Sequence, residues 1–220
     1  MKKAFLFDMD GVLVDTQWIH TLALQKVFAR YGVETDIDEL NCFAGTKRGT
    51  AITAMVEKFQ LDLDIEALCD LKDEIFDALI DETELEPIPG IPELLQGLKD
   101  RSVPTAIASS SSPEFIGLVV DRVNIRPYFD RFVSGQLLPK SKPDPAIYLL
   151  AAKEVGIAPE DCVVLEDAAL GVEAAKAAGM YCIGYRNPSS GEQDLSKADE
   201  IVEEITQIDL GKLFGNISGK

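Results

Sequence analysis

Histidine is almost absent from this sequence, which carries a single one at position 20. Its four cysteines have neither CxxC spacing nor a histidine cluster beside them, so we expect buried free thiols and no structural zinc site. Basic residues are also scarce, because 21 lysines and arginines stand against 38 acidic residues and leave a formal net charge of −17. An acidic protein repels polyanions, so neither nucleic acid nor an anionic membrane is an expected partner.

Long apolar stretches and nucleotide-binding motifs are missing as well. No run approaches the ~20 apolar residues that span a bilayer, and the start MKKAFLFD has too short an apolar run for a signal-peptide core. We therefore expect a soluble, cytoplasmic protein, and we expect it to be a monomer. The absence of a GxxxxGK[ST] run argues against a nucleoside-triphosphate hydrolase.

Short apolar runs are the feature that the sequence does contain. They are typical of strands buried on both faces of a parallel sheet, and they lie at residues 3–8, 103–108, 131–135, 162–166, 181–185 and, more weakly, 200–202. Segments with helical periodicity alternate with them at residues 92–101, 113–123, 145–155 and 168–178. This β-α-β-α order predicts an α/β fold with a doubly wound parallel sheet.

Residues 16–83 interrupt this alternation. They show helical periodicity without a convincing strand, and the chain returns from them through ELEPIPG, whose two prolines favour a stiff connection. We therefore predict an all-helical cap domain at residues 16–83, inserted into a discontinuous α/β core domain of residues 1–15 and 84–220.

Polar side chains follow four of the predicted strands, at the edge where ligands of open α/β sheets bind. Four carboxylates crowded there repel one another unless a cation neutralises them, and an all-oxygen set favours a hard ion, Mg²⁺ first. Magnesium accepts phosphate oxygens, and lysine and serine are natural phosphate ligands, so the expected substrate is a small phosphorylated metabolite. In chain order, the four strands lead to Asp8 and Asp10, to Ser109 and Ser110, to Lys142, and to Glu166 and Asp167.

Asp8 and Asp10 are two residues apart in DMDGVLVDT, so on an extended chain both carboxylates project to one side. A metal-bound, ionised Asp8 could attack phosphorus and form an aspartyl-phosphate. Asp10, if its side chain points away from the metal, could protonate the leaving oxygen and later activate water. That role requires the pKa of Asp10 to rise from about 3.9 towards neutrality.

Four stretches carry a resemblance to a known family. DMDGVLVDT, the serine of TAIAS, SKPDP and VVLEDAALGVEAAKAAG resemble the four motifs of the haloacid dehalogenase superfamily in order and spacing, and the helical insert resembles its C1-type cap. The dehalogenases themselves lack the second aspartate of the first motif, so Asp10 favours phosphoryl chemistry. The resemblance implies Asp8 as nucleophile and metal ligand, Asp10 as general acid/base whose backbone carbonyl binds the metal, Ser109 and Lys142 as phosphate ligands, and Glu166 and Asp167 as further magnesium ligands.

Some of these residues have a structural alternative. Asp8 and Asp10 could merely cap a loop, and Asp167 could be the N-cap of the following helix, although four matched strand ends favour the functional interpretation. Ser112 is expected to be only the helix cap before Pro113. Lys140 is expected to be a solvated charge.

The basic residues of the helical insert are less specific. A lone histidine is more often a packing or surface residue, but the nearness of His20 to the site mouth keeps contact with substrate open. Singly, Lys47, Arg48 and Lys72 are expected to be solvated charges. Because GTKRG is a compact basic loop in an acidic protein, we predict that Arg48 or Lys47 helps to recognise substrate.

The leading functional hypothesis is a Mg²⁺-dependent phosphatase for a sugar phosphate, whose cap excludes water and selects the leaving group. A β-phosphoglucomutase-like phosphotransferase is the alternative, because those mutases are similar in DMDGVLVDT, His20, Arg48 and VLEDAALG. Ala44 and Pro113 depart from the lysine and asparagine that the mutases carry. A third possibility is a receiver-like module phosphorylated on aspartate without turnover, but receivers are shorter, have no cap and carry their acceptor on a later strand.

Overall fold

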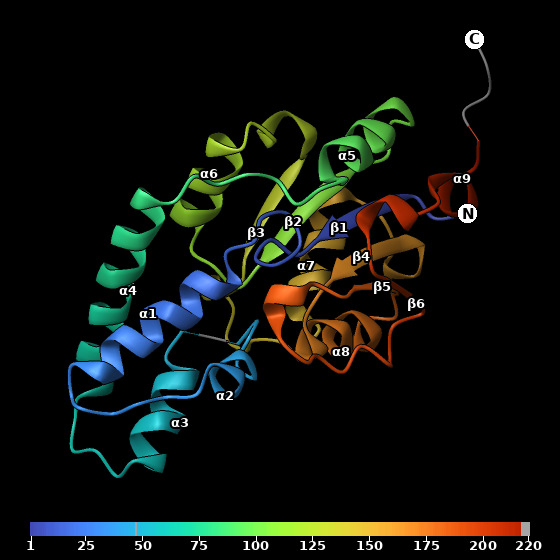
Figure 1. Cartoon of the computed structure of the whole chain (residues 1–220). Coiled ribbons are helices and arrows are strands. Elements are labelled where there is room, and N and C mark those ends of the chain that lie inside the picture. Colours follow the sequence, from blue (N-terminus) through green and yellow to red (C-terminus); the bar gives the residue numbers. More distant parts are fainter. Residues whose placement is uncertain (47, 217–220) are drawn as a thin grey trace.

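The computed structural model of this protein describes residues 1–46 and 48–216. Its centre is a six-stranded sheet, in which every neighbouring pair of strands is parallel (Figure 1). The order β3-β2-β1-β4-β5-β6 places the reversal of winding beside β1, and all six strands predicted from the sequence are confirmed. The strands are β1 (Ala4–Phe7), β2 (Thr105–Ser109), β3 (Arg131–Ser134), β4 (Cys162–Glu166), β5 (Tyr181–Tyr185) and β6 (Glu200–Val202).

Helices cover both faces of the sheet, because successive side chains of a buried strand point to opposite faces. Phe5 and Phe7 of β1 belong to one hydrophobic cluster, with α5 (Ile91–Asp100), α6 (Pro113–Arg122) and α9 (Leu210–Phe214). Ala4 and Leu6 of the same strand belong to the opposite cluster, with α7 (Ala146–Val155) and α8 (Ala169–Ala177). The predicted doubly wound α/β fold is therefore confirmed.

Between β1 and α5, the helix and strand elements of the described residues are all helices, as expected. These helices are α1 (Gln17–Ala29), α2 (Ile37–Asn41), α3 (Thr50–Lys58) and α4 (Ile65–Glu82), and α1, α3 and α4 lie to one side of the sheet in Figure 1. They enclose a hydrophobic cluster of their own, against which Phe115 and Leu118 of α6 also pack. The exact division into a cap of residues 16–83 and a core of residues 1–15 and 84–220 stays a prediction.

Short elements and caps complete the fold. Ser112 accepts a hydrogen bond from the Phe115 amide at the start of α6, which confirms it as a helix cap. The four cysteines are free as expected, but Cys42 is exposed instead of buried. The 3₁₀ helices are η1 (Arg126–Tyr128), η2 (Gly135–Leu137), η3 (Pro159–Asp161), η4 (Pro188–Ser190) and η5 (Ile205–Gln207).

None of the helices within residues 1–46 and 48–216 has both the length and the apolar character that crossing a membrane requires.

Candidate active site

The strand order brings the predicted site residues to one edge of the sheet. Strand β1 pairs with β2 on one side and with β4 on the other, so the residue that follows β1, Asp8, lies between the ends of β2 and β4. The Asp8 amide donates a hydrogen bond to the Leu165 carbonyl, 3.0 Å away, which fixes the backbone of Asp8 against β4. The carboxyl ends of three adjacent strands therefore surround this side chain.

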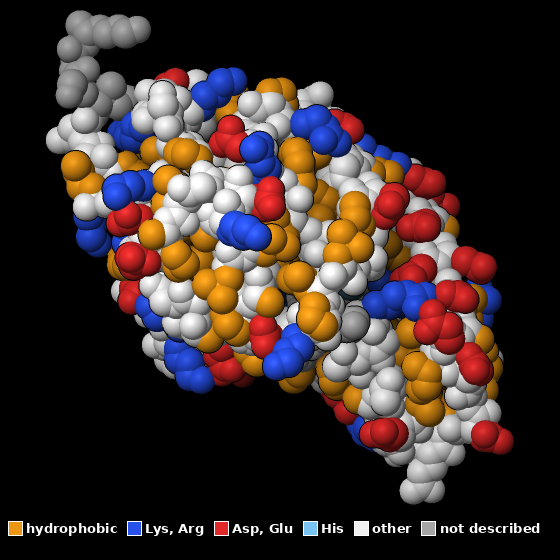
Figure 2. All heavy atoms as spheres, turned by 180° about the vertical axis from the view of Figure 1, so that it is seen from behind, with side chains coloured by type: hydrophobic (Ala, Val, Ile, Leu, Met, Phe, Trp, Pro, Cys, Tyr) orange, Lys and Arg blue, Asp and Glu red, His pale blue; other side chains and the backbone are white. Residues whose placement is uncertain are grey.

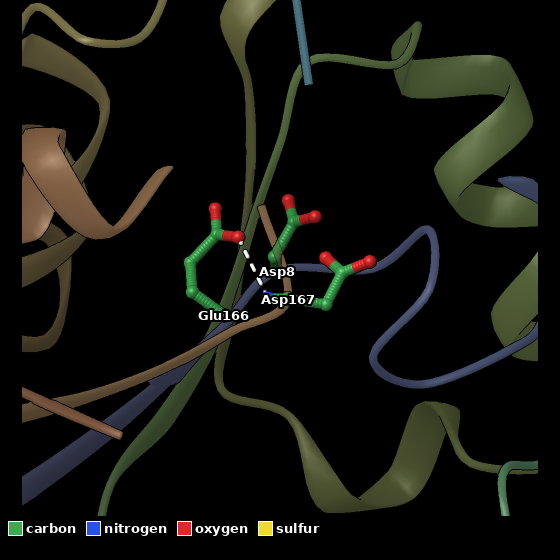
Figure 3. A group of neighbouring side chains, drawn as sticks. All are labelled: Asp8, Glu166 and Asp167. Carbon is green, nitrogen blue, oxygen red and sulfur yellow. Dashed lines mark hydrogen bonds between the residues drawn. The ribbon is translucent and has the colours of Figure 1, made fainter. Parts of the chain in front are cut away.

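Three buried carboxylates form a cluster at this edge. Asp8, Glu166 and Asp167 each offer an oxygen atom, and these atoms lie within 4.8 Å of one another (Figure 3). Burial and the neighbouring carboxylates of Glu166 and Asp10 raise the pKa of Asp8 to about 7, although Lys142 opposes the shift. Burial, with the charges of Glu166 and Asp8, likewise raises the pKa of Asp167 well above its usual value.

These residues fit a divalent metal ion. All three ligands are oxygen atoms, and within the described residues no cysteine or histidine joins the cluster. A hard cation suits such a donor set, and its charge would favour the ionised carboxylates against the burial and the mutual repulsion that raise the pKa values of Asp8 and Asp167. The arrangement can therefore bind a metal and keep Asp8 ionised.

Lys142 is the internal counter-ion of this cluster. Its ammonium nitrogen lies 2.8 Å from Asp8 Oδ1 and 2.5 Å from Glu166 Oε1, and the side chain is buried. Burial lowers the pKa of Lys142, but the two carboxylates outweigh it and raise the pKa above the usual value. Lys140, by contrast, is exposed, as expected, and its ammonium nitrogen lies 3.5 Å from Asp144.

Glu166 accepts hydrogen bonds at both of its carboxylate oxygens. Besides Lys142, the Tyr148 hydroxyl donates to Glu166 Oε1 over 2.7 Å, and the amides of Asp167 and Ala168 donate to Oε2 over 2.9 and 3.0 Å. The alternative that Asp167 caps the following helix is wrong, because the N-cap position of α8 is Ala168 and the Asp167 carboxylate accepts from the Ser190 hydroxyl instead. Sequence reasoning missed Tyr148, which has the spacing of an ordinary core residue of α7.

Asp10 lies apart from the three-carboxylate cluster. Its carboxylate accepts hydrogen bonds from Thr16 over 2.5 Å and from Ser111 over 2.8 Å, and His20 Nε2 lies 3.6 Å away. Burial raises the pKa of Asp10, but the contacts with His20, Thr16 and Ser111 outweigh this and lower the pKa to about 2. The expected rise towards neutrality is therefore wrong for the free protein, because the contacts with His20, Thr16 and Ser111 stabilise the ionised form of this carboxylate more than burial destabilises it.

The predicted phosphate-binding serines have different contacts. The buried Ser109 hydroxyl accepts a hydrogen bond from the Ser111 amide over 3.0 Å, whereas the Ser110 hydroxyl donates to the Gly45 carbonyl of the helical segment over 3.0 Å. Ser111, which sequence reasoning passed over, contacts Asp10 directly. The four consecutive serines gave no signal to distinguish these roles, because the backbone path after β2 decides which hydroxyl points where.

His20 connects Asp10 to the helical segment. Its ring stacks on Phe76 with a centroid distance of 4.1 Å, and its Nδ1 lies 3.1 Å from the ammonium nitrogen of Lys72. An ammonium group only donates, so Nδ1 is the acceptor and Nε2 carries the proton that faces Asp10. The expectation that Lys72 is a solvated charge is wrong, since its side chain is only 17% exposed and burial lowers its pKa.

A cavity of about 410 Å³ lies between the strand ends and the helical segment. Asp8, Asp10 and Asp167 line one end of it, and His20 and Arg48 lie among the residues that line the rest. Lys142, Glu166 and Ser109 are buried and are not among the lining residues. Lys47, the other predicted cap residue, lies outside the described residues.

Two glycines allow the backbone to lie close to the carboxylates. Gly11 has φ +80°, and a Cβ atom there would lie 2.1 Å from Asp167 Oδ2. Gly171, in the first turn of α8, would place a Cβ atom 1.7 Å from Glu166 Oε1. Both positions therefore need glycine because a methyl group would occupy the space of a carboxylate.

We predict that Gly171→Ala disturbs the site while the helix stays formed. Alanine favours helix over glycine, but its methyl group must push Glu166 away from Lys142 and Tyr148. We expect a roughly 10- to 100-fold weaker affinity for Mg²⁺, measured by calorimetry, as for other residues that support metal ligands. Gly117→Ala on α6 is the matched control, because its Cβ would meet only the end of the flexible Arg126 side chain. Equal metal affinity in the two variants would contradict the assignment.

Comparison with known proteins gives consistent matches over nearly the whole chain. A family model described as haloacid dehalogenase-like hydrolase matches residues 2–179. Fructose-1-phosphate phosphatase YqaB from Escherichia coli is 33% identical over 182 residues, which cover 82% of this chain and 95% of that protein. The crystal structure of β-phosphoglucomutase from Clostridium difficile is similar with a TM-score of 0.85 and 26% identity, over 97% of this chain and 96% of that one. CbbY from Rhodobacter sphaeroides, in complex with xylulose-(1,5)bisphosphate, gives a TM-score of 0.81 and 29% identity over 94% and 96%.

Proposed function

The chain belongs to the haloacid dehalogenase-like hydrolases, and on that premise we propose that it is a Mg²⁺-dependent phosphatase that hydrolyses a sugar phosphate or a similar small phosphorylated metabolite. The observation that carries this proposal is the position of Asp8. Its carboxylate belongs to the three-carboxylate cluster, contacts Lys142 and also lines the cavity in which Asp10 lies. These contacts support Asp8 as the nucleophile, Lys142 as its counter-ion and Asp10 as the proton-transfer group.

Each half of the reaction has a residue in place. An Asp8 oxygen attacks phosphorus, so that a bond from Asp8 to phosphorus forms while the bond to the leaving oxygen breaks. Asp10 gives a proton to that leaving oxygen, then takes a proton from water as the water oxygen attacks phosphorus and releases Asp8. The products are an alcohol and inorganic phosphate.

The protonation state of Asp10 depends on whether substrate is bound. In the free protein its low pKa suits the second half of the reaction, in which it acts as a base. A phosphate group entering the cavity brings negative charge close to Asp10, and like charges favour the protonated carboxyl. We therefore infer that substrate binding supplies the raised pKa that the first half requires.

Asp8, Glu166 and Asp167 are the side chains that would hold Mg²⁺, and we assign a further contact to the backbone carbonyl of Asp10. When bound, the ion supplies positive charge that keeps Asp8 ionised and offsets the charge of the phosphate oxygens. Lys142 adds a fixed positive charge next to Asp8 Oδ1. We assign the phosphate contacts to Lys142, Ser109 and Ser110.

The β-phosphoglucomutase-like alternative is kept because of the fold match and because His20 contacts Asp10. Ala44 lines the cavity where those mutases carry a lysine, which favours hydrolysis. An assay of β-glucose 1-phosphate isomerisation with added glucose 1,6-bisphosphate separates the two functions. The receiver-like alternative finds no support, since the family is one of hydrolases.

The expectations about binding partners, cellular location and oligomeric state are part of the proposal. The net charge of −17 supports an absence of nucleic-acid and membrane partners. A cytoplasmic location and a monomeric state stay predictions, which fractionation and light scattering would test.

Metal removal tests the proposed function directly. We expect the protein to release phosphate from members of a phosphometabolite panel in Mg²⁺ and to lose that turnover in EDTA, with recovery when Mg²⁺ is added back. Mg²⁺ should also raise the Tm by several degrees, because a ligand at about 100 times its Kd stabilises the folded state by about 2.7 kcal/mol. Turnover that is indifferent to EDTA, or no turnover of any panel member, would contradict the proposal.

A further inference from the structure

The cavity has two chemically different ends. The strand end carries Asp8, Asp10 and Asp167, to which the proposed function assigns metal binding and catalysis. The opposite end is formed by the helical segment and must receive whatever part of the substrate the phosphate is attached to. The side chains at this helical end therefore decide which leaving groups the protein accepts.

Arg48 is the first of two described cations at the helical end, and its guanidinium is already paired. Its Nε lies 2.7 Å from Asp73, and its two terminal nitrogens lie 2.6 Å from Glu66 and from Asp70. These three acids are spaced i, i+4 and i+7 on α4, so they share one face of the helix. One positive charge therefore meets three negative charges, which leaves the group acidic.

Lys72 is the second described cation, and it is paired as well. Its ammonium donates to His20 Nδ1 over 3.1 Å, lies 4.5 Å from the centre of the Phe76 ring and lies 3.7 Å from Asp73. Asp77 also lines the cavity on this side. Both described cations at the helical end thus already have partners, and a second anionic group would have to compete with carboxylates for them.

Apolar side chains make up much of the remaining wall. The apolar residues that line the cavity include Leu24, Leu40, Ala44, Ile52, Phe76 and Phe115. The surface around this end is acidic too, since acidic side chains gather over the helical segment (Figure 2). A second phosphate placed here would lose its hydration to an apolar wall and would face carboxylates.

We propose that the protein selects phosphate monoesters whose leaving group carries no second anionic group, and that the pairing of Arg48 with Glu66, Asp70 and Asp73 enforces this choice. The inference rests on the proposed function, because it takes the strand end of the cavity as the place where the reacting phosphate binds. A bisphosphate would have to draw Arg48 away from three carboxylates, whereas a neutral sugar or polyol can pack on the apolar wall and leave the ion pairs intact.

The test compares fructose 1-phosphate with fructose 1,6-bisphosphate, which differ only in the second phosphate. We expect wild-type kcat/KM in Mg²⁺ to be about 10-fold higher for the monophosphate, since several partly exposed ion pairs must be broken for the bisphosphate. The variant Glu66→Gln/Asp70→Asn/Asp73→Asn frees Arg48, so the bisphosphate should improve selectively until the ratio is near one. Adding Arg48→Ala to this variant should remove the improvement.

A charge-matched control separates pairing from net charge. Glu57→Gln/Glu74→Gln/Glu82→Gln removes the same number of negative charges from exposed residues of α3 and α4 that form no ion pair in the described part of the chain. We expect this control to keep the wild-type preference. An equal improvement in the control would overturn the role of the Arg48 pairing.

Binding distinguishes a failure of this inference from a failure of the proposed function. Calorimetry with Asp8→Asn in Mg²⁺ compares the Kd values of the two sugar phosphates without turnover, and a tighter monophosphate supports the inference even if the wild type hydrolyses nothing. Equal or tighter binding of the bisphosphate overturns the inference while a turning-over wild type would still support the phosphatase. If neither compound binds, both the inference and the proposed function are overturned.

Discussion

Asp8→Asn is expected to abolish turnover, with kcat lowered by roughly 10⁴-fold or more, as for other nucleophile replacements. The amide cannot form the bond to phosphorus that the proposed reaction requires. The fold should survive, because the introduced asparagine keeps an oxygen that can accept from Lys142 and replaces a buried carboxyl whose pKa is about 7. The measurement is phosphate release in Mg²⁺ on the phosphometabolite panel, with Tm recorded on the same samples.

The matched control is Asp62→Asn, which makes the same chemical change at an exposed residue of the loop before α4. We expect wild-type kcat and an unchanged Tm. If Asp8→Asn kept substantial activity while it remained folded, covalent catalysis by Asp8 would be wrong, and water activated at the carboxylate cluster would be the better explanation. A radiolabel retained on the wild type from a ³²P-labelled substrate, and absent from Asp8→Asn, would support the aspartyl-phosphate independently.

Lys142→Met is expected to have the second largest effect and to act on stability as well as on activity. The methionine fills a similar volume but leaves Asp8 and Glu166 buried without their counter-ion. Removing one partner of a buried ion pair costs about 3–5 kcal/mol, so urea unfolding should show a loss of that size in the free energy of unfolding. Phosphate release should fall sharply, because the fixed positive charge at Asp8 is lost.

Mg²⁺ should restore part of the stability of Lys142→Met, since the ion would offset the same carboxylates. Lys140→Met is the control two residues earlier, where the side chain is 75% exposed and pairs with Asp144 over 3.5 Å. We expect a change within about 1 kcal/mol there, as for exposed ion pairs. Equal effects of the two substitutions would show that Lys142 does not neutralise the cluster.

The sheet could be predicted from the sequence because its strands are short apolar runs buried on both faces. Even the three-residue strand β6 is where its weaker run indicated. The approach of Asp8, Lys142, Glu166 and Asp167 followed from the same logic, because the carboxyl ends of parallel strands share one edge. Periodicity and strand position were sufficient for these results.

The contacts of the polar side chains were less predictable. The sequence offered four adjacent serines, but only the chain path after β2 decides that Ser111 contacts Asp10 while Ser110 contacts Gly45. It also gave no reason to separate Tyr148 from the core residues of α7 or Lys72 from the solvated lysines. The pKa of Asp10 went the other way from the expectation because Thr16, Ser111 and His20 all meet at its carboxylate.

The sequence by itself determined the α/β fold, the helical insert and the carboxylates that follow the strand ends, because hydrophobic periodicity and the position of residues at strand ends are local properties of the chain. Only the tertiary structure decided which charged side chains pair with one another. Glu66, Asp70 and Asp73 share one face of α4 in any helix, but their pairing with Arg48 needs the loop before α3 to pack against that face. Electrostatic roles depend on distances and burial, and the folded chain sets both.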